Sequence, residues 1–147
     1  MQKKSIFAER LQELMEDANL NASALTNLLG CGHYTINRYQ SGELPSLEMI
    51  IIIADFFKCS IDFLLGREDE SISRNFLNCP PFQKRFPYLL SYFKISAYRL
   101  QKLTGISESV ITYWRQGKCS PTLDSVVRIA NTLSCSVDFV IGRINEE

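Results

Sequence analysis

The stretch that decides the fold is ISAYRLQKLTGISESVITYWRQG, which occupies residues 95–117. Its apolar residues return every three or four positions, a spacing that predicts helix with one buried face. Gly105 interrupts the pattern, and glycine often ends a helix because it adopts a positive φ without strain. The stretch therefore predicts a helix, a glycine turn and a second helix, with Leu100 and Leu103 of the first helix facing inward.

The same pattern occurs earlier in the chain. A shift of 75 positions aligns residues 7–42 with 82–117, and a shift of 76 aligns residues 47–67 with 123–143. Of the 57 aligned residues, 18 are identical. Such agreement over two colinear stretches predicts two copies of one fold in tandem.

We expect a first domain at residues 1–67, a connector at residues 68–80 and a second domain at residues 81–147. The whole chain has no net charge, with 16 Lys+Arg and 16 Asp+Glu. The first 75 residues hold 7 basic and 11 acidic residues, a net charge of −4, and the remainder holds 9 and 5, a net charge of +4. The second copy is therefore expected to supply most of any attraction to phosphate.

Each copy has the pattern of five helices, so we expect an all-α protein. The second helix of each copy follows a short polar residue suited to cap it, Asn21 or Ser96. The third helix is expected to begin near Gly32 or Ser107 and to end at a glycine. In the first copy the residues expected on the buried sides of these two helices are Leu25, Leu28, Ile36 and Tyr39. In the second copy they are Leu100, Leu103, Ile111 and Trp114.

Several features argue against other classes of protein. The longest apolar run, residues 49–54, is far shorter than the roughly 20 residues that cross a bilayer, and no signal-length apolar segment follows the N-terminus. Five cysteines without a C-x-x-C pair, and the single histidine His33, do not predict a zinc site. No phosphate-binding glycine loop occurs, nor a carboxylate cluster outside the first helix and the connector. We therefore expect a cytoplasmic, non-enzymatic protein without catalytic residues, cofactor, metal or small-molecule ligand.

Residues 95–117 resemble the lambda-repressor/Cro-like helix-turn-helix family, often called XRE. The resemblance continues through Pro121, Leu123, Ala130 and residues 136–143. In the first copy the matching residues are Leu25, Gly30, Ile36, Tyr39, Gly42, Pro45, Leu47, Ala54 and residues 60–67. The resemblance implies two tandem five-helix DNA-binding domains in a sequence-specific transcriptional regulator of the bacterial or phage repressor type.

The resemblance also implies which side chains meet double-stranded DNA. The third helix would enter the major groove, which is about 12 Å wide, and the start of the second helix would lie on phosphate. The candidate base contacts are His33, Tyr34, Thr35, Asn37, Arg38, Ser107, Glu108, Ser109, Thr112 and Tyr113. The candidate phosphate contacts are Asn21, Ser23, Ser96, Tyr98 and Lys118. Among the base contacts, Asn37 and Arg38 are best suited to readout, because Asn pairs well with adenine and Arg with guanine.

Two alternatives stay open at this point. The exposed polar residues of the third helices can form a solvated face without a role in DNA binding. The acidic first repeat can instead bind a protein partner or a second copy of the chain, so that only the second repeat contacts DNA. If both repeats read DNA, their half-sites should differ in sequence, because the two copies share almost none of the candidate base contacts.

Overall fold

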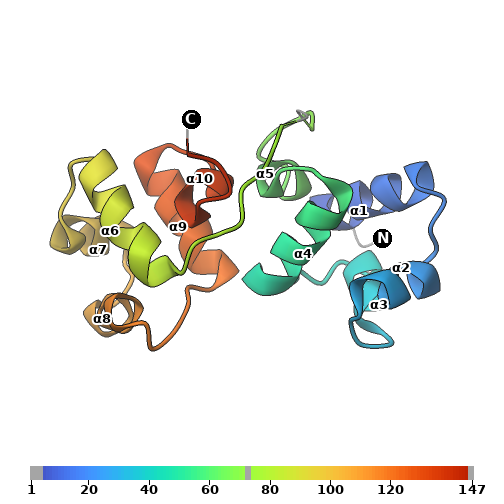
Figure 1. Cartoon of the computed structure of the whole chain (residues 1–147), viewed down its shortest axis with the longest axis horizontal. Coiled ribbons are helices and arrows are strands. Elements are labelled where there is room, and N and C mark those ends of the chain that lie inside the picture. Colours follow the sequence, from blue (N-terminus) through green and yellow to red (C-terminus); the bar gives the residue numbers. More distant parts are fainter. Residues whose placement is uncertain (1–4, 72–73, 146–147) are drawn as a thin grey trace. The chain divides into compact units, whose positions relative to one another are not determined.

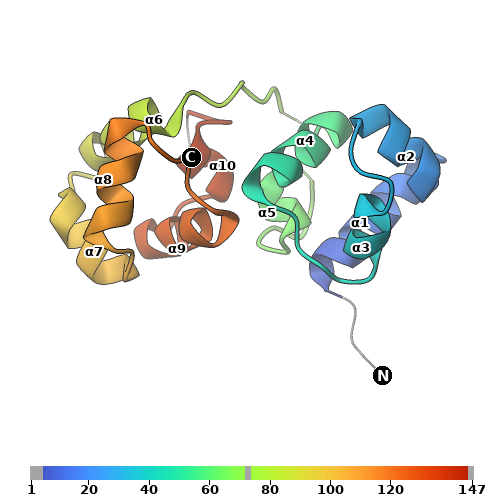
Figure 2. The same cartoon turned by 90° about the horizontal axis from the view of Figure 1, so that it is seen from below.

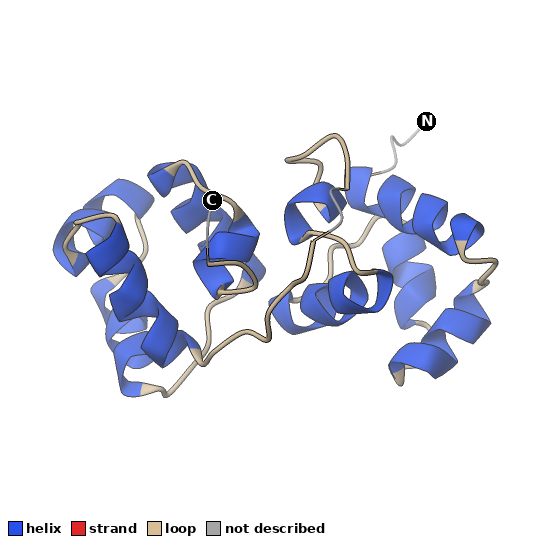
Figure 3. Ribbon diagram, turned by 45° about the horizontal axis from the view of Figure 1, so that its top comes forward, coloured by secondary structure: helices blue, strands red, loops and turns tan. Residues whose placement is uncertain are grey.

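A computed structural model of the protein describes residues 5–71 and 74–145. Backbone contacts divide the chain into two compact units, Met1–Arg74 and Asn75–Glu147. The described residues form helices, turns and loops without a strand (Figure 3). The all-α class is therefore confirmed, and the division between the units lies inside the segment 68–80 that we expect to connect the domains.

The first unit contains five helices, drawn from blue to green in Figure 1. They are α1 (Ile6–Asp17), α2 (Ala22–Leu29), α3 (Thr35–Gln40), α4 (Leu47–Phe57) and α5 (Ile61–Leu64). Four of them follow a polar residue whose side-chain oxygen accepts a hydrogen bond from the backbone N–H three residues ahead. These capping residues are Ser5, Asn21, Ser46 and Ser60. The caps fix the start of each helix because they satisfy an amide that has no partner within the helix.

The second unit repeats this arrangement, and in it α8 packs against α6 and α7 (Figure 2). Its helices are α6 (Phe82–Tyr92), α7 (Ala97–Thr104), α8 (Glu108–Gln116), α9 (Leu123–Leu133) and α10 (Val137–Ile141). The capping residues of the last four are Ser96, Ser107, Thr122 and Ser136. Four of the five helices in each unit thus begin after a capping residue.

The inner face of the third helix joins the core of each unit. In the first unit Ile36 and Tyr39 are buried, and the ring of Tyr39 meets the ring of Phe7 edge-on, with centroids 5.8 Å apart. In the second unit Trp114 is buried between Phe82 and Phe86, at centroid distances of 5.3 and 5.7 Å. The expected burial of this face is confirmed, and it leaves the opposite face of each third helix free of its own core.

The expectation that Leu28 and Leu103 face inward was wrong. Their exposed fractions are 59% and 50%, although the neighbouring Leu25 and Leu100 are fully buried. The buried stripe of α2 consists of Leu25 and Thr26, flanked by the half-buried Ala22 and Leu29. Leu28 lies about 60° around the helix from Leu25, on the side away from Thr26. A leucine three positions from a core leucine is therefore not enough to predict burial in a helix of two turns.

The third helix of the first unit begins later than we expect from the sequence. It starts at Thr35 rather than near Gly32, and its N-cap residue Tyr34 makes no side-chain capping bond. Tyrosine has no oxygen near its own backbone, so the residues before Thr35 form a turn in which the Thr35 N–H donates to the Gly32 carbonyl over 3.1 Å. His33 and Tyr34 consequently lie in the turn before α3. In the second unit α8 begins at Glu108, directly after Ser107, as the sequence predicts.

An arginine from the first helix of each unit closes the fold. Arg10 donates through Nη1 to the carbonyls of Phe63 and Glu68, at 3.3 and 3.2 Å. Arg85 donates through Nε to the carbonyl of Phe139 at 3.1 Å, and its other nitrogens reach Ile144 and Asn145. Burial lowers the pKa of the Arg85 guanidinium, because the charged form is desolvated. Both arginines bind the last helix of their unit to the first.

In each unit an ion pair joins an aspartate of the last helix to an arginine that follows the helix. Asp62 accepts from Arg67 Nε over 2.7 Å in the first unit, and Asp138 pairs with Arg143 in the second. In the second unit the Arg143 guanidinium also lies 4.1 Å from the ring centroid of Phe76. The backbone carbonyl of Arg143 accepts a hydrogen bond from the backbone N–H of Leu77 at 2.8 Å. Residues of the segment that precedes α6 are therefore packed onto the second unit.

All five cysteines lie in the described part of the chain and form no disulfide with one another. Cys59 and Cys135 are buried in equivalent positions of the two units, and Cys31 and Cys79 are half-buried. Cys119, in the loop after α8, is exposed. The first four thus behave as small apolar residues of the fold, and Cys119 differs from them in its contact with solvent.

Candidate nucleic-acid interface

The outward face of α3 carries Asn37 and Arg38, both exposed. They lie beside Ile36 and Tyr39, which the core fixes, so that the backbone of the helix holds its polar residues in one direction. Desolvation raises the pKa of the Tyr39 hydroxyl and keeps this core residue neutral. A rigid buried side thus supports an uncovered polar side on a short helix.

A hollow of about 450 Å³ separates the start of α2 from α3. Its lining consists of Asn21, Ala22, Ser23, Thr26, Asn27, His33 and Asn37. The structure thus brings two candidate phosphate contacts, Asn21 and Ser23, next to two candidate base contacts. The Asn21 side-chain oxygen accepts from the Ala24 N–H at 2.8 Å, and its amide nitrogen carries the donors that an anion requires.

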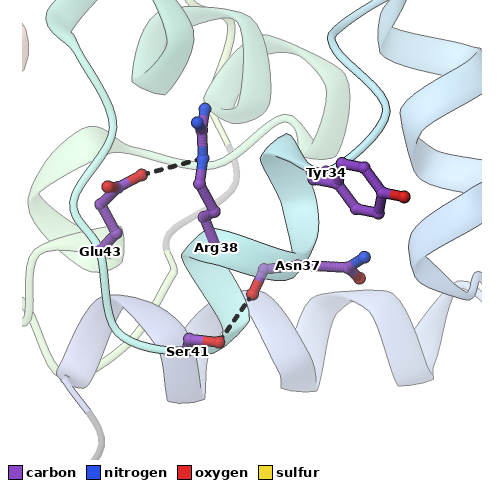
Figure 4. Close-up of a pocket in the computed structure, with 5 residues that line it drawn as sticks. All are labelled: Tyr34, Asn37, Arg38, Ser41 and Glu43. Carbon is purple, nitrogen blue, oxygen red and sulfur yellow. Dashed lines mark hydrogen bonds and ion pairs between the residues drawn. The ribbon is translucent and has the colours of Figure 1, made fainter.

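A second hollow lies at the other edge of α3 (Figure 4). It is lined by Tyr34, Asn37, Arg38, Ser41 and Glu43. Here Arg38 Nε lies 3.3 Å from the Glu43 carboxylate, and the Ser41 hydroxyl donates to the Asn37 carbonyl at 3.0 Å. The guanidinium that we expect to read a base is therefore engaged by a carboxylate of its own unit.

The outward face of α8 has a different composition. Glu108, Ser109, Thr112 and Tyr113 are exposed, whereas Ile111 and Trp114 are buried on the opposite side. The hydroxyl oxygen of Ser107 accepts from the Val110 N–H at 3.3 Å. Its hydrogen can still be donated to a phosphate or base, because a hydroxyl is both donor and acceptor.

Exposed cations lie on or next to the second and third helices of this unit. They are Arg99 and Lys102 on α7, Arg115 on α8 and Lys118 just after it. The Lys102 ammonium lies 5.2 Å from the ring centroid of Tyr98, and the Lys118 ammonium lies 5.8 Å from that of Tyr113. Our sequence reasoning missed Arg99 and Lys102 as candidates. The signal was the comparison of the copies, since their equivalents in the first unit are the uncharged Ala24 and Asn27.

The sequence candidates share one property in the structure, which is exposure on the side of the second and third helices. Thr35 is the exception, because its side chain is half-buried. Its hydroxyl oxygen lies close to Gly32, 3.0 Å from the point that a Cβ atom on that glycine would occupy. Tyr34 and Tyr98 are the most open aromatic candidates, at 68% and 66% exposed. Accessibility permits contact with a ligand, and the individual base and phosphate contacts stay predictions.

Comparison with known proteins identifies the family. The family model described as the Cro/C1-type HTH DNA-binding domain matches residues 10–70 and 87–144. Together these regions cover most of the chain, one in each unit, and the chain belongs to this family. The resemblance drawn from the sequence is thereby confirmed, together with the tandem helix-turn-helix architecture.

A curated relative is the HTH-type transcriptional regulator AnsR of Bacillus subtilis (strain 168), which is 40% identical over 63 residues. The match covers 42% of this chain and 54% of AnsR, so it spans about half the length of that protein. No solved structure matches the chain.

Within residues 5–71 and 74–145, every helix is too short or too polar to span a bilayer. The same residues contain no group of three or more His, Cys, Asp or Glu side chains placed to hold a metal ion.

Proposed function

We propose that the protein regulates transcription by binding double-stranded DNA in a sequence-specific manner through the outward faces of α3 and α8. One observation carries the proposal: each unit buries one side of its third helix and leaves the polar side uncovered. A helix of that kind fits the major groove, where base edges offer hydrogen-bond donors and acceptors to polar side chains. The family to which the chain belongs supports this use of the third helix.

The two faces suit different bases. In the first unit Asn37 has the donor and acceptor that suit adenine, and Arg38 has the donors that suit guanine. In the second unit the Thr112 methyl group suits a thymine methyl, and the Glu108 carboxylate suits the amino group of cytosine. One chain that uses both units should consequently bind two half-sites of unlike sequence, and a palindromic site should require two chains.

Phosphate contacts would position the units without specifying a sequence. The candidates are Asn21, Ser23, Ser96, Tyr98 and Lys118, to which we add Arg99 and Lys102. Most of these side chains lie at or near the start of α2 or α7, where the exposed amides of a helix N-terminus also favour an anion. We propose no catalytic activity and no cofactor for this chain, and we place it in the cytoplasm with its DNA.

Selection of bound fragments from random duplex DNA tests the proposal. We expect enrichment of two unlike half-sites. Asn37→Ala should weaken binding to the selected duplex by about 1–3 kcal/mol, the range of one good bidentate base contact, and leave binding to unrelated duplex unchanged. Asn78→Ala is the matched control, because Asn78 is an exposed asparagine outside the helix faces. Absence of any enriched sequence would contradict the proposal.

A second candidate function rests on the charge of the first unit. Its net charge is −4, and Glu43 occupies the position of the second unit's Lys118. In this alternative the first unit binds a protein partner or a second copy of the chain, and only the second unit contacts DNA. The selected duplexes would then contain a single half-site, and Asn37→Ala would leave DNA binding unchanged.

A further inference from the structure

The two units place two side chains together in the same way at the end of the third helix. In the first unit the Glu43 N–H donates to the Arg38 carbonyl at 3.1 Å. In the second unit the Lys118 N–H donates to the Tyr113 carbonyl at 2.9 Å. Both pairs are five residues apart and are related by the 75-residue shift. One backbone geometry therefore presents an Arg–Glu pair in the first unit and a Tyr–Lys pair in the second.

The consequences for charge are opposite. Glu43 forms an ion pair with Arg38 at 3.3 Å. The Arg38 side chain is 60% exposed and the Glu43 side chain is 56% exposed. The two charges cancel when seen from a distance. In the second unit the Lys118 ammonium lies over the Tyr113 ring, which attracts the cation without neutralising it. Lys118 thus retains a full positive charge at the edge of α8.

The rest of each face extends the difference. The second unit has Arg99 and Lys102 where the first unit has Ala24 and Asn27. Against these cations it carries one carboxylate, Glu108. The face of the second unit is therefore electropositive, and the face of the first unit holds one cation that is already paired.

We propose that Glu43 lowers the affinity of the first unit for DNA. By pairing with Arg38 it weakens the attraction of that arginine to phosphate, and it repels phosphate itself. A guanine that receives two hydrogen bonds from Arg38 must break the pair as well. The first unit is therefore the weaker DNA contact, and the second unit anchors the chain on phosphate. This inference rests on the proposed function.

The variant Glu43→Gln tests the inference in the full chain. Affinity is measured for a selected duplex and for a scrambled duplex over a series of salt concentrations. Affinity for the scrambled duplex should rise by at most about fivefold, the upper limit for loss of an exposed ion pair. The selected duplex should gain at least as much, because guanine binding then no longer has to break the ion pair. The slope of log K against log salt for the scrambled duplex should steepen by at most about 0.9, because Arg38 becomes available to one phosphate.

Two controls separate this effect from a simple change of charge. Glu13→Gln removes an exposed carboxylate from α1 and should leave both affinities nearly unchanged. In the double variant Arg38→Ala/Glu43→Gln, the glutamine should raise the affinities less than it does alone, because part of its action requires Arg38. A structural role for Glu43 alone would not produce this dependence.

Exchange of the pairs tests both units at once. Arg38→Tyr/Glu43→Lys gives the first unit the pair of the second and should increase affinity for scrambled DNA. Tyr113→Arg/Lys118→Glu makes the reverse exchange and should make the salt slope shallower by about 0.9, since one phosphate contact is lost.

The outcomes distinguish this inference from the proposed function. No effect of Glu43→Gln on either duplex would overturn the role of Glu43 while DNA binding itself stood. An unchanged salt slope after the reverse exchange would overturn the anchoring role of the second unit. Failure of the unmodified chain to bind any duplex would overturn the proposed function, and the inference with it.

Discussion

The two units share the residues that close their folds and differ in the residues that face solvent. Arg10 and Arg85 are identical in position and in role, since each binds the carbonyl groups of the last helix in its unit. On the outward faces no equivalent pair among the candidate base contacts is identical, for example Asn37 and Thr112. The comparison teaches that identity between the copies marks architecture, and divergence on an exposed face marks the ligand that each copy selects.

The units also differ in how deeply their closing ion pairs are buried. The Arg143 side chain has no exposed surface, whereas the Arg67 side chain is 26% exposed. In the second unit Phe76 and Leu77 contact Arg143. The same two residue types therefore form an interior pair in one unit and a boundary pair in the other.

The largest expected effect is a loss of stability when the more deeply buried of these ion pairs is broken. Arg143→Ala leaves the buried Asp138 without its principal cation and should destabilise the second unit by about 3–5 kcal/mol. The chain has a single tryptophan, Trp114, buried in the second unit. Urea unfolding followed by tryptophan fluorescence therefore measures this unit selectively, and its midpoint should fall.

The matched variant is Arg67→Ala. Asp62 is as buried as Asp138, with 2% of each side chain exposed, but the site of the partly exposed Arg67 is open to water. We therefore expect a smaller loss of about 1.5–3 kcal/mol in the first unit, the range for a hydrogen bond to a charged group. Circular dichroism, which detects the helices of both units, should record the loss, and the Trp114 signal should stay in place. Equal losses for the two arginines would break the distinction between interior and boundary pairs.

A second prediction tests whether the cores are equivalent. Leu25→Ala and Leu100→Ala each empty a fully buried position and should each cost about 2–5 kcal/mol. Leu28→Ala and Leu103→Ala change exposed side chains and should stay within about 0.5 kcal/mol of the unmodified chain. Thermal or urea unfolding provides the values. A large cost for Leu28→Ala would mean that a surface absent from this structure covers it.

The smallest effect concerns the start of the third helix. Ser107→Ala removes the cap of α8 and should destabilise the second unit by about 0.5–2 kcal/mol. Tyr34→Ala removes a residue that makes no capping bond in α3, so it should cost nothing through this mechanism. Hydrogen exchange of the first amides in each helix would compare the two directly. Equal protection losses would contradict the difference in capping.

Much of the fold could be predicted from the sequence, because its causes are local. The cap at Asn21, the glycine at Gly30 and the buried Ile36 and Tyr39 each follow from residue chemistry and helical spacing, and the structure contains all of them. The repeat strengthened each assignment by presenting it twice. Positive φ values at Gly30 and Gly105, 67° and 75°, confirm that glycine ends the second helix of each unit.

Features that depend on packing between distant segments could not be predicted in this way. The exposure of Leu28 depends on which side of α2 packs inward. Helical spacing alone does not decide whether Leu28 lies on that side with Leu25 or outside it. The role of Arg85 requires carbonyl groups more than fifty residues away. The pairing of Arg38 with Glu43 depends on the turn after α3, which brings a loop carboxylate back to the helix face.

The exposed thiol of Cys119 gives the second unit a chemical handle. It directly follows Lys118, whereas the other four cysteines are buried or half-buried. A maleimide dye should react there first, because solvent reaches that sulfur most readily. A fluorophore on Cys119 would stand beside the edge of α8 and would report, by quenching or anisotropy, the arrival of a duplex at one unit of the pair.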